Sequence, residues 1–427
     1  MAGSWKGYTF VAATVITVLA ATGVWNPFPK LWTWINTSEP IAPGTTWQQR
    51  LGGTPQSVAV VGDTVLVEYR TSVEAYGLTA AVKLWGSDAD WAEVAGKGAD
   101  AVVVTGRLLT KGYQVLDPHT GVVKRADTEA SAVWTYQNGI VDLRCAKGDD
   151  CRLTAWDPRS GAQLWQVGTG SIGFVLDAAN PDLPDTQRLG TDDVDDDVAG
   201  PTQMPGLFGL PDDGRVRVID TATGRLVQTV QAGADQRIAV VAGRVLTITG
   251  SAGDGTCYFS VAATDPPRSG LVWKRDGLNL RTASSGSACE QDRDPAGGDN
   301  VLLGVDPYGR KQLINAYDGR ILWYGDKKAE VLAIDDGYAV IRDGDGALRG
   351  WSFSKGKTVW RQSGKEKAGV AITPNAVVVV SSGKVTALTR ADGAIRADVR
   401  TDAKVFATGP DGMILVSGRD MAYLPFS

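Results

Sequence analysis

Short stretches of alternating apolar and polar residues recur along the chain, and many end in a turn of the form Asp-x-x-Ser/Thr-Gly. In residues 153–166, LTAWDPRSGAQLWQ, an alternating run ends at Asp157, Gly161 supplies a permissive backbone, and Trp165 follows four residues later. Alternation with a period of two predicts a half-buried strand, and glycine allows the chain to reverse tightly. The pattern therefore predicts a hairpin with a large ring on its second strand.

The same frame returns in altered form at five other places and in degraded form at two more. The clear copies are residues 113–125, 216–229, 311–324, 348–361 and 385–398, and the degraded or stretched copies are residues 73–86 and 257–274. The recurrent residues are the acids Asp117, Asp157 and Asp220, the glycines Gly121, Gly161, Gly224, Gly319, Gly356 and Gly393, and the rings Trp165, Trp273, Trp323 and Trp360. A ring that recurs at this place would pack between neighbouring sheets.

Each hairpin is preceded by two further short apolar runs, which makes four strands per unit. One four-stranded sheet cannot bury both of its faces, so the copies must stack radially, and we predict an all-β fold, a single β-propeller of four-stranded blades. A literal count gives nine blades if residues 45–53 supply the outer strand of a last unit at residues 404–426. Eight is the commoner closure, so we favour eight blades, with nine as the alternative.

An uncharged apolar run at residues 8–25 precedes the repeats. As a helix it would be about 27 Å long, close to the thickness of the hydrocarbon core of a bilayer. We predict a short cytoplasmic tail at residues 1–7, a transmembrane anchor at 8–25, a juxtamembrane linker at 26–44, and the propeller at 45–427 on the extracytoplasmic side of the cell membrane. A cleaved signal peptide is the alternative interpretation of the run.

The four cysteines agree with export of the propeller. Cys145 and Cys151 flank a five-residue turn segment that could bring two strand ends within disulfide reach, and Cys257 and Cys289 could form a second bridge. A zinc site is disfavoured because the chain has no Cys-x-x-Cys spacing and one histidine only, His119, which lies in a predicted hairpin turn. We therefore expect disulfides and no metal site.

The Trp-ended frame resembles the pyrroloquinoline-quinone-like (PQQ-like) propeller repeat, which reads roughly Ala-Leu-Asp-x-x-Thr-Gly-x-x-x-Trp. The resemblance covers nearly everything after residue 45 and implies the propeller fold. The family contains quinoprotein dehydrogenases, which bind the quinone and calcium, and non-enzymatic members similar to the scaffold lipoprotein of the outer-membrane β-barrel assembly machinery. The composition, together with a short anchor, also resembles membrane-tethered propellers of actinobacteria.

Catalytic chemistry finds little support in these residues. The resemblance implies an adjacent Cys-Cys pair for a quinoprotein dehydrogenase of this type, and the chain has no adjacent cysteines. A catalytic triad is not expected because His119 has no second histidine beside it and no Ser or Cys nucleophile has a plausible base. We expect no enzymatic activity, no catalytic residue and no cofactor, with PQQ and calcium only under the dehydrogenase alternative.

One insertion, residues 177–206, lengthens a blade and carries five carboxylates: Asp192, Asp193, Asp195, Asp196 and Asp197. A calcium loop is one interpretation, but an EF-hand frame that starts at Asp193 would need glycine and glutamate where the chain has Val198 and Met204. We favour a solvated acidic loop, and we take it as the candidate contact surface, with deletion expected to leave folding intact.

A formal net charge of −5 argues against a nucleic-acid partner, because phosphate contacts need an excess of Lys and Arg. We predict a non-enzymatic, membrane-tethered, extracytoplasmic propeller that acts as a protein-interaction scaffold in the cell envelope. Its partners would be the membrane, through the N-terminal helix, and an envelope protein. The alternatives are a PQQ-dependent dehydrogenase, on analogy of fold alone, and a sensor that binds a small ligand or glycan in the central funnel.

Overall fold

Strands and tight turns make up nearly all of the chain that the computed structural model describes. The described residues are 40–146, 150–170, 187–188, 200–212, 215–253, 256–266, 270–280, 295–298, 300–363 and 368–427. Residues Ala42–Ser427 belong to one unit, which contains all of the described strands. The apolar run at residues 8–25 lies outside the described residues, and no helix among those that are described is long and apolar enough to cross a membrane.

The described strands form nine sheets, which we number as blades in chain order. Blade 1 consists of β2 (Ser57–Val61), β3 (Thr64–Glu68), β4 (Val73–Gly77) and β5 (Lys83–Ser87). Blade 2 consists of β6 (Trp91–Ala95), β7 (Val102–Gly106), β8 (Tyr113–Leu116) and β9 (Val123–Asp127), with a 3-10 turn at Gly98–Asp100. Blade 3 consists of β10 (Ala132–Tyr136), β11 (Gly139–Cys145), β12 (Cys151–Trp156) and β13 (Gln163–Gly170).

Blades 4 to 6 depart most from the regular pattern. Blade 4 has three strands, β15 (Leu207–Asp212), β16 (Arg215–Asp220) and β17 (Arg225–Gln231). Blade 5 consists of β18 (Gln236–Val241), β19 (Arg244–Gly253), β20 (Thr256–Asp265) and β21 (Gly270–Asp276). Blade 6 consists of β22 (Ala296–Gly298), β23 (Val301–Val305), β24 (Lys311–Asn315) and β25 (Ile321–Tyr324), and it gains a fifth strand, β14 (Gln187–Arg188).

The last three blades are regular again. Blade 7 consists of β26 (Glu330–Ile334), β27 (Tyr338–Arg342), β28 (Leu348–Ser352) and β29 (Lys357–Gln362). Blade 8 consists of β30 (Gly369–Ile372), β31 (Val377–Ser381), β32 (Lys384–Leu388) and β33 (Ile395–Arg400). Blade 9 consists of β34 (Lys404–Gly409), β35 (Gly412–Ser417), β36 (Asp420–Pro425) and, from the other end of the chain, β1 (Trp47–Arg50).

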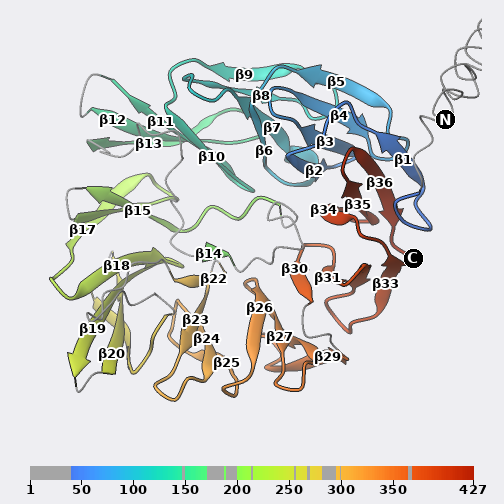
Figure 1. Cartoon of the computed structure of the whole chain (residues 1–427). Coiled ribbons are helices and arrows are strands. Elements are labelled where there is room, and N and C mark those ends of the chain that lie inside the picture. The colour runs from blue at the N-terminus through green and yellow to red at the C-terminus, as the bar shows by residue number, and fades with distance from the viewer. Residues whose placement is uncertain are drawn as a thin grey trace, which may run out of the picture. The chain divides into compact units, whose positions relative to one another are not determined.

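The sheets are arranged around a ring in which the first strand of a regular blade lies nearest the centre (Figure 1). The predicted all-β propeller is therefore confirmed, but the preference for eight blades is wrong, because the described strands form nine sheets. Two blades that depart from the repeat, blades 2 and 4, both form sheets. Blade 2 has Arg125 where the repeat has its ring, and blade 4 lacks an inner strand, so each departs from the frame without losing its place in the ring.

The tryptophan of one blade packs against the turn glycine of the next. Rings of four outer strands, β5, β13, β21 and β29, cover these glycines in the pairs Trp85–Gly121, Trp165–Gly224, Trp273–Gly319 and Trp360–Gly393. A Cβ atom at any of the four glycines would lie 2.6 or 2.7 Å from a tryptophan atom, which is too close for any side chain. The indole N–H adds a bond across the gap in two cases, since Trp85 donates to Pro118 O and Trp273 to Ala316 O, each at 2.9 Å.

The turn acids and glycines shape the hairpin on which each ring rests. Asp117 Oδ1 accepts hydrogen bonds from the backbone N–H groups of His119 and Thr120, and the Thr120 N–H in particular lowers the pKa of Asp117 to about 2. Asp157 and Asp220 accept the corresponding N–H groups in their own turns. The six turn glycines all have φ between +58° and +73°, a region that other residues enter only at a cost.

Two glycine variants allow the cost of alanine at a positive φ to be measured with and without a clash against a tryptophan ring. Gly224→Ala is expected to lower the free energy of unfolding by about 2 to 4 kcal/mol, because alanine is strained at positive φ and its Cβ would overlap Trp165. Gly356→Ala should cost only about 1 kcal/mol, because Gly356 also has a positive φ but nothing lies within 4 Å of the added Cβ. Equal losses in urea unfolding of the two variants would show that the ring contact contributes nothing.

Trp323 departs from this arrangement. Its ring packs against Gly325 in its own blade, and no atom of it lies within 4 Å of a Cβ placed at Gly356. Instead Trp351 of the next blade donates its N–H to Leu322 O at 3.0 Å. Blade 7 therefore adds a tryptophan of its own to the contact with blade 6, while Trp323 packs with Val331 and Ile341 of blade 7.

The ring is closed by β1, as the sequence predicts. β1 pairs with β36 in antiparallel register, so the N-terminal strand completes the sheet formed by the C-terminal residues. Trp47 on β1 stacks on Tyr423 and donates its N–H to Leu78 O of blade 1 at 2.7 Å. Trp47 thus joins blade 9 to blade 1 in the way that the repeat tryptophans join their neighbours.

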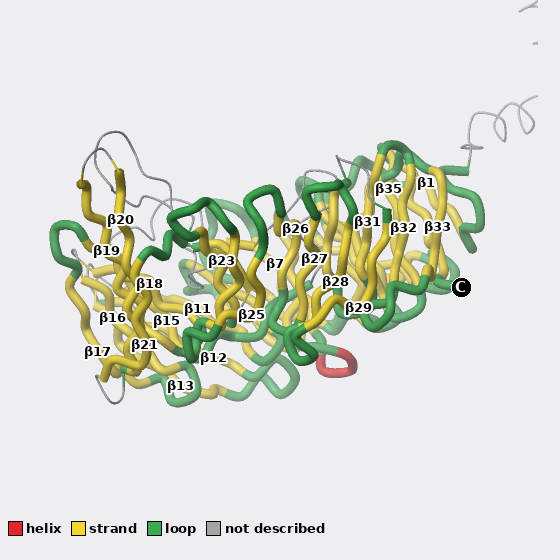
Figure 2. Tube along the Cα trace, turned by 90° about the horizontal axis from the view of Figure 1, so that it is seen from below, coloured by secondary structure: helices red, strands yellow, loops and turns green. Residues whose placement is uncertain are grey.

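The alternation of antiparallel strands divides the loops between two faces. Loops between the second and third strands of a blade lie at the same end as the connections between blades, and we call this end the loop face. The Asp-x-x-x-Gly turns lie at the opposite end, which we call the turn face. On the loop face β19 and β20 extend beyond their neighbours β18 and β21 (Figure 2), which pair with them only as far as Thr249 and Ser260.

Candidate functional site

A cavity of about 200 Å³, which we call the channel, lies against the inner strands of blades 1 to 3. It is lined by residues of three inner strands, Ser57 and Ala59 of β2, Ala92, Glu93 and Val94 of β6, and Thr135 of β10, and by Gly200, Pro201 and Thr202. The last three residues belong to the 177–206 insertion. The chain therefore contributes part of its own insertion to the wall of the channel.

Two described parts of the insertion contact different blades. Gln187–Arg188 forms β14 and pairs in parallel with the inner strand β22 of blade 6. Farther along, Thr202 O accepts the N–H of Gln137 at 2.7 Å, and the N–H of Met204 donates to Asn138 Oδ1 at 2.8 Å, both at the β10–β11 turn of blade 3. The chain then enters β15, the first strand of blade 4, so in chain order the insertion precedes the blade that has only three described strands.

This placement changes the expectation for the insertion. Met204 is buried, with 7% of its surface exposed, in a core with Phe208, Trp165 and Tyr136, so the end of the insertion is part of the interior of the propeller. Deletion of residues 177–206 would remove this packing, and the expectation that deletion leaves folding intact is not tenable. The five aspartates at 192–197 lie outside the described residues.

Met204 gives a direct test of this anchoring. Met204→Ala is expected to lower the free energy of unfolding by about 2 to 4 kcal/mol, because its side chain fills the space above Gly139 and leaves a cavity when removed. Gln203→Ala, one residue earlier and exposed, should change it by less than about 0.5 kcal/mol. Urea unfolding of both variants checks the difference, and a loss below 1 kcal/mol for Met204→Ala would place the segment outside the core.

The channel does not fit the quinone of the dehydrogenase alternative. PQQ carries three carboxylates, and the described lining offers one carboxylate, Glu93, and neither Lys nor Arg. The volume also falls below the range of about 300 to 1,000 Å³ that is usual for small-molecule sites. No group of three or more His, Cys, Asp or Glu in the described part of the chain is placed to hold a metal ion such as calcium.

A buried polar cluster joins blades 2 and 3. Its centre is Asp142 on β11, whose side chain is fully buried. Asp142 Oδ2 accepts hydrogen bonds from the Tyr113 hydroxyl and the Trp156 indole, both at 2.7 Å, and lies 3.1 Å from Nη2 of Arg125. Burial, followed by the charge of Asp142, raises the pKa of Tyr113 above its ordinary value, so the hydroxyl remains a donor.

Arg125 occupies the place of the repeat tryptophan in blade 2, four residues after Gly121. Its aliphatic chain reaches Gly161 of the next blade, and its guanidinium lies 3.5 Å from the centre of the Trp156 ring. An arginine can cover a glycine turn and stack on a ring, but its charge then needs a buried partner. Asp142 supplies that partner, which explains why a carboxylate is buried between these blades.

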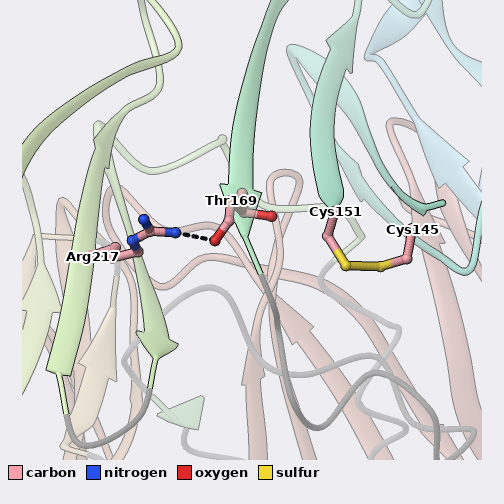
Figure 3. The surroundings of a disulfide bond; sticks show 4 residues. All are labelled: Cys145, Cys151, Thr169 and Arg217. Carbon is pink, nitrogen blue, oxygen red and sulfur yellow. Dashed lines mark hydrogen bonds between the residues drawn. A yellow bond between two sulfur atoms is a disulfide. The ribbon is translucent and has the colours of Figure 1, made fainter. Parts of the chain in front are cut away.

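The cluster continues toward the loop face through Arg144. Arg144 lies 3.5 Å from Asp142 and also pairs with Asp127, the last residue of β9. The next residue, Cys145, forms a disulfide with Cys151 across the end of the β11–β12 hairpin, which confirms the first predicted bridge (Figure 3). Arg217 of blade 4 donates to Thr169 O nearby on β13. Cys257 is also in a disulfide, and Cys289 lies outside the described residues.

The sequence alone reveals the recurrent residues but not the buried polar cluster around Asp142. The repeat acids, glycines and tryptophans lie on outer hairpins and build the scaffold, and His119 is exposed in its turn. Asp142, Arg125 and Tyr113 were not among the candidates. The available signal was the arginine at a tryptophan position, which indicates that something other than an apolar contact joins those two blades.

One segment of the chain matches a model of a known protein family. Residues 259–408 match a family model described as outer membrane protein assembly factor BamB, and no curated protein sequence matches the chain. This match confirms, for that segment, the PQQ-like repeat predicted from the Trp-ended frame.

Solved structures with a similar fold include BamB from Moraxella catarrhalis, at 18% identity and a TM-score of 0.37, over 84% of this chain and 99% of that chain. A quinohemoprotein alcohol dehydrogenase from Pseudomonas putida HK5 is 12% identical, with a TM-score of 0.39, over 90% of this chain and 76% of that chain. Sqt1 from Saccharomyces cerevisiae is 9% identical, with a TM-score of 0.40, over 90% and 100%.

Proposed function

We propose that this chain is a non-enzymatic scaffold of the cell envelope that holds a partner protein on a rigid β-propeller. The observation that carries the proposal is the match of residues 259–408 to the BamB family model, whose description names a factor in the assembly of outer membrane proteins. A scaffold of this kind needs a stable frame and a surface that differs from the repeat.

The construction of the propeller supports this function. Tryptophan and glycine contacts repeat from blade to blade and fix neighbouring sheets against each other, while the turn face carries a similar glycine turn of positive φ before the last strand of six blades. The loop face is more varied, since it carries the disulfide at Cys145 and Cys151 and the long β19–β20 hairpin. Loops held by a rigid scaffold are where partner recognition usually resides.

Tethering to the membrane is part of the proposal. It rests on the uncharged run at residues 8–25 and on the disulfides, which form in oxidising compartments. The propeller would then lie on the extracytoplasmic side, next to envelope proteins. The dehydrogenase alternative is not favoured, because the described lining of the channel does not fit the quinone.

The test is cross-linking of the tagged, full-length chain in its native membranes, followed by identification of the linked proteins. The expected result is one envelope protein, recovered repeatedly and lost when residues 1–25 are replaced by a cleavable signal peptide that frees the propeller from the membrane. Recovery of the chain alone would reject the scaffold, and dye-linked dehydrogenase activity after addition of PQQ and calcium would then favour the dehydrogenase.

A further inference from the structure

The most exposed large apolar side chain of the described residues, that of Leu109, lies next to a second exposed leucine in one loop. Leu108 and Leu109 form the tip of the loop between β7 and β8 of blade 2, on the loop face. Leu109 is 94% exposed and Leu108 is 57% exposed. The flanking residues, Arg107 and Lys111, are cationic and exposed, and Lys111 has no ion-pair partner among the described residues.

Leu109 also has an unfavourable backbone conformation. Its φ is +62°, in the left-handed region that suits glycine. The other non-glycine residues with positive φ among those described are small: Ala81, Ala242 and Ser382. Leu109 therefore has both a strained backbone and an exposed side chain, and neither feature stabilises the folded chain. Such strain is retained where it serves a function.

The base of the loop is held rigidly. Gly112 donates its N–H to Ala130 O at 2.8 Å, and a Cβ at Gly112 would lie 2.3 Å from Asp127 O, so the chain turns against the β9 end without room for a side chain. Tyr113 follows directly and is bonded to Asp142 in the buried cluster. At the tip, the N–H of Leu108 donates to Asp90 Oδ2 at 2.9 Å. The two leucines are thus presented on a loop that is already ordered.

We propose that Leu108 and Leu109 form a preordered apolar knob that inserts into a pocket of a partner protein, with a carboxylate at the pocket rim that pairs with Lys111. A preordered side chain loses little conformational entropy on binding, and buried apolar anchors supply much of the affinity of protein interfaces. The proposal rests on the proposed scaffold function and names the surface that the scaffold uses.

A protein pocket suits this loop better than a lipid surface does. Asp88 and Asp90 lie beside the tip, where Asp88 is 4.0 Å from Arg107 and Asp90 accepts the Leu108 N–H. Together they offset the charges of Arg107 and Lys111, so the loop has no cationic excess to bind anionic headgroups. A pocket with one suitably placed carboxylate can still use Lys111.

The first experiment places a photo-crosslinking residue at position 109 of the full-length chain in native membranes. Position 271 is the matched control, because Leu271 is 64% exposed and lies on the outer strand β21 of blade 5. The probe at 109 is expected to capture the envelope protein found by general cross-linking, and the probe at 271 is expected not to. Capture of lipid, or of a second copy of this chain, by the probe at 109 would overturn the proposal.

The second experiment measures the affinity of that purified protein for full-length variants. Leu109→Gly removes the more exposed side chain of the knob and relieves the backbone, so we expect binding to weaken by about 10- to 100-fold while the melting temperature stays unchanged or rises. Ala242→Gly relieves a similar backbone on the turn face and should leave affinity unchanged. A lower melting temperature for Leu109→Gly would instead assign the leucine a structural role and overturn the proposal.

The two proposals fail in different ways. If the partner is captured but binds Leu109→Gly as tightly as the parent chain, the proposal that the knob binds the partner is wrong, and the proposed scaffold function stands. If neither general cross-linking nor the probes recover a protein partner, the scaffold function is rejected and the knob with it.

Discussion

Replacement of Asp142 by alanine is expected to lower the free energy of unfolding by about 3 to 5 kcal/mol. Asp142 is fully buried and is the common acceptor for Tyr113, Trp156 and Arg125. Without it, the guanidinium of Arg125 stays partly buried between two blades with its main anionic partner removed. An uncompensated buried charge costs much more than the net stabilisation that an intact ion pair provides.

The measurement is urea unfolding of the full-length chain, with Asp345→Ala as the matched control. Asp345 pairs with Arg361 at the protein surface, so its loss should cost less than about 1 kcal/mol. The double variant Asp142→Ala with Arg125→Met should recover part of the loss, because it removes the unpaired charge. Equal, small effects of Asp142→Ala and Asp345→Ala would show that the cluster does not hold blades 2 and 3 together.

The second large effect is expected at the closure of the ring. Trp47→Ala should lower the free energy of unfolding by about 3 kcal/mol, because it removes the stack on Tyr423 and the hydrogen bond to Leu78 O of blade 1. β1 is a four-residue strand held on one side by β36, so this ring is its main contact with the next blade. Trp47→Phe keeps a ring but not the N–H donor and should lose only about 1 kcal/mol.

Limited proteolysis distinguishes loss of closure from a general loss of stability. In Trp47→Ala, cleavage is expected first at residues 51–56, which connect β1 to β2, while the rest of the propeller remains intact. Simultaneous cleavage in all blades would mean that the ring does not depend on this closure.

Local pattern in the sequence predicts much of this fold. The hairpins expected at residues 113–125 and 153–166 are β8–β9 and β12–β13, and residues 45–53 contain the closing strand β1. Period-two alternation, a turn acid and a glycine at positive φ are properties of a few neighbouring residues, so they can be read from the chain directly. The literal count of nine blades is correct, and the preference for eight is wrong because it relied on the commoner closure. Blade 2 keeps its place in the ring with Arg125 at the position of the tryptophan.

The features that distinguish this propeller depend on contacts between distant residues. Gln187–Arg188 follows blade 3 in the chain but pairs with β22 of blade 6, and no local pattern in the sequence indicates this pairing. In the sequence, Asp142 is an ordinary polar residue of a strand. Its role becomes clear only from the structure, in which it contacts Arg125 and Trp156. The strain at Leu109 is likewise a property of its φ angle and its exposure, since the residues Arg107 to Lys111 read as an ordinary loop.

The measurement that tests the central claim most directly is hydrogen exchange of the full-length chain with and without its captured envelope partner. If the chain is a scaffold that binds through the loop face, slower exchange is expected at residues 105–113 of blade 2 and at the adjacent hairpin end around Cys145 and Cys151. Protection confined to the turn face, at residues 117–121 and 157–161, or no protection at any described strand or loop, would contradict it.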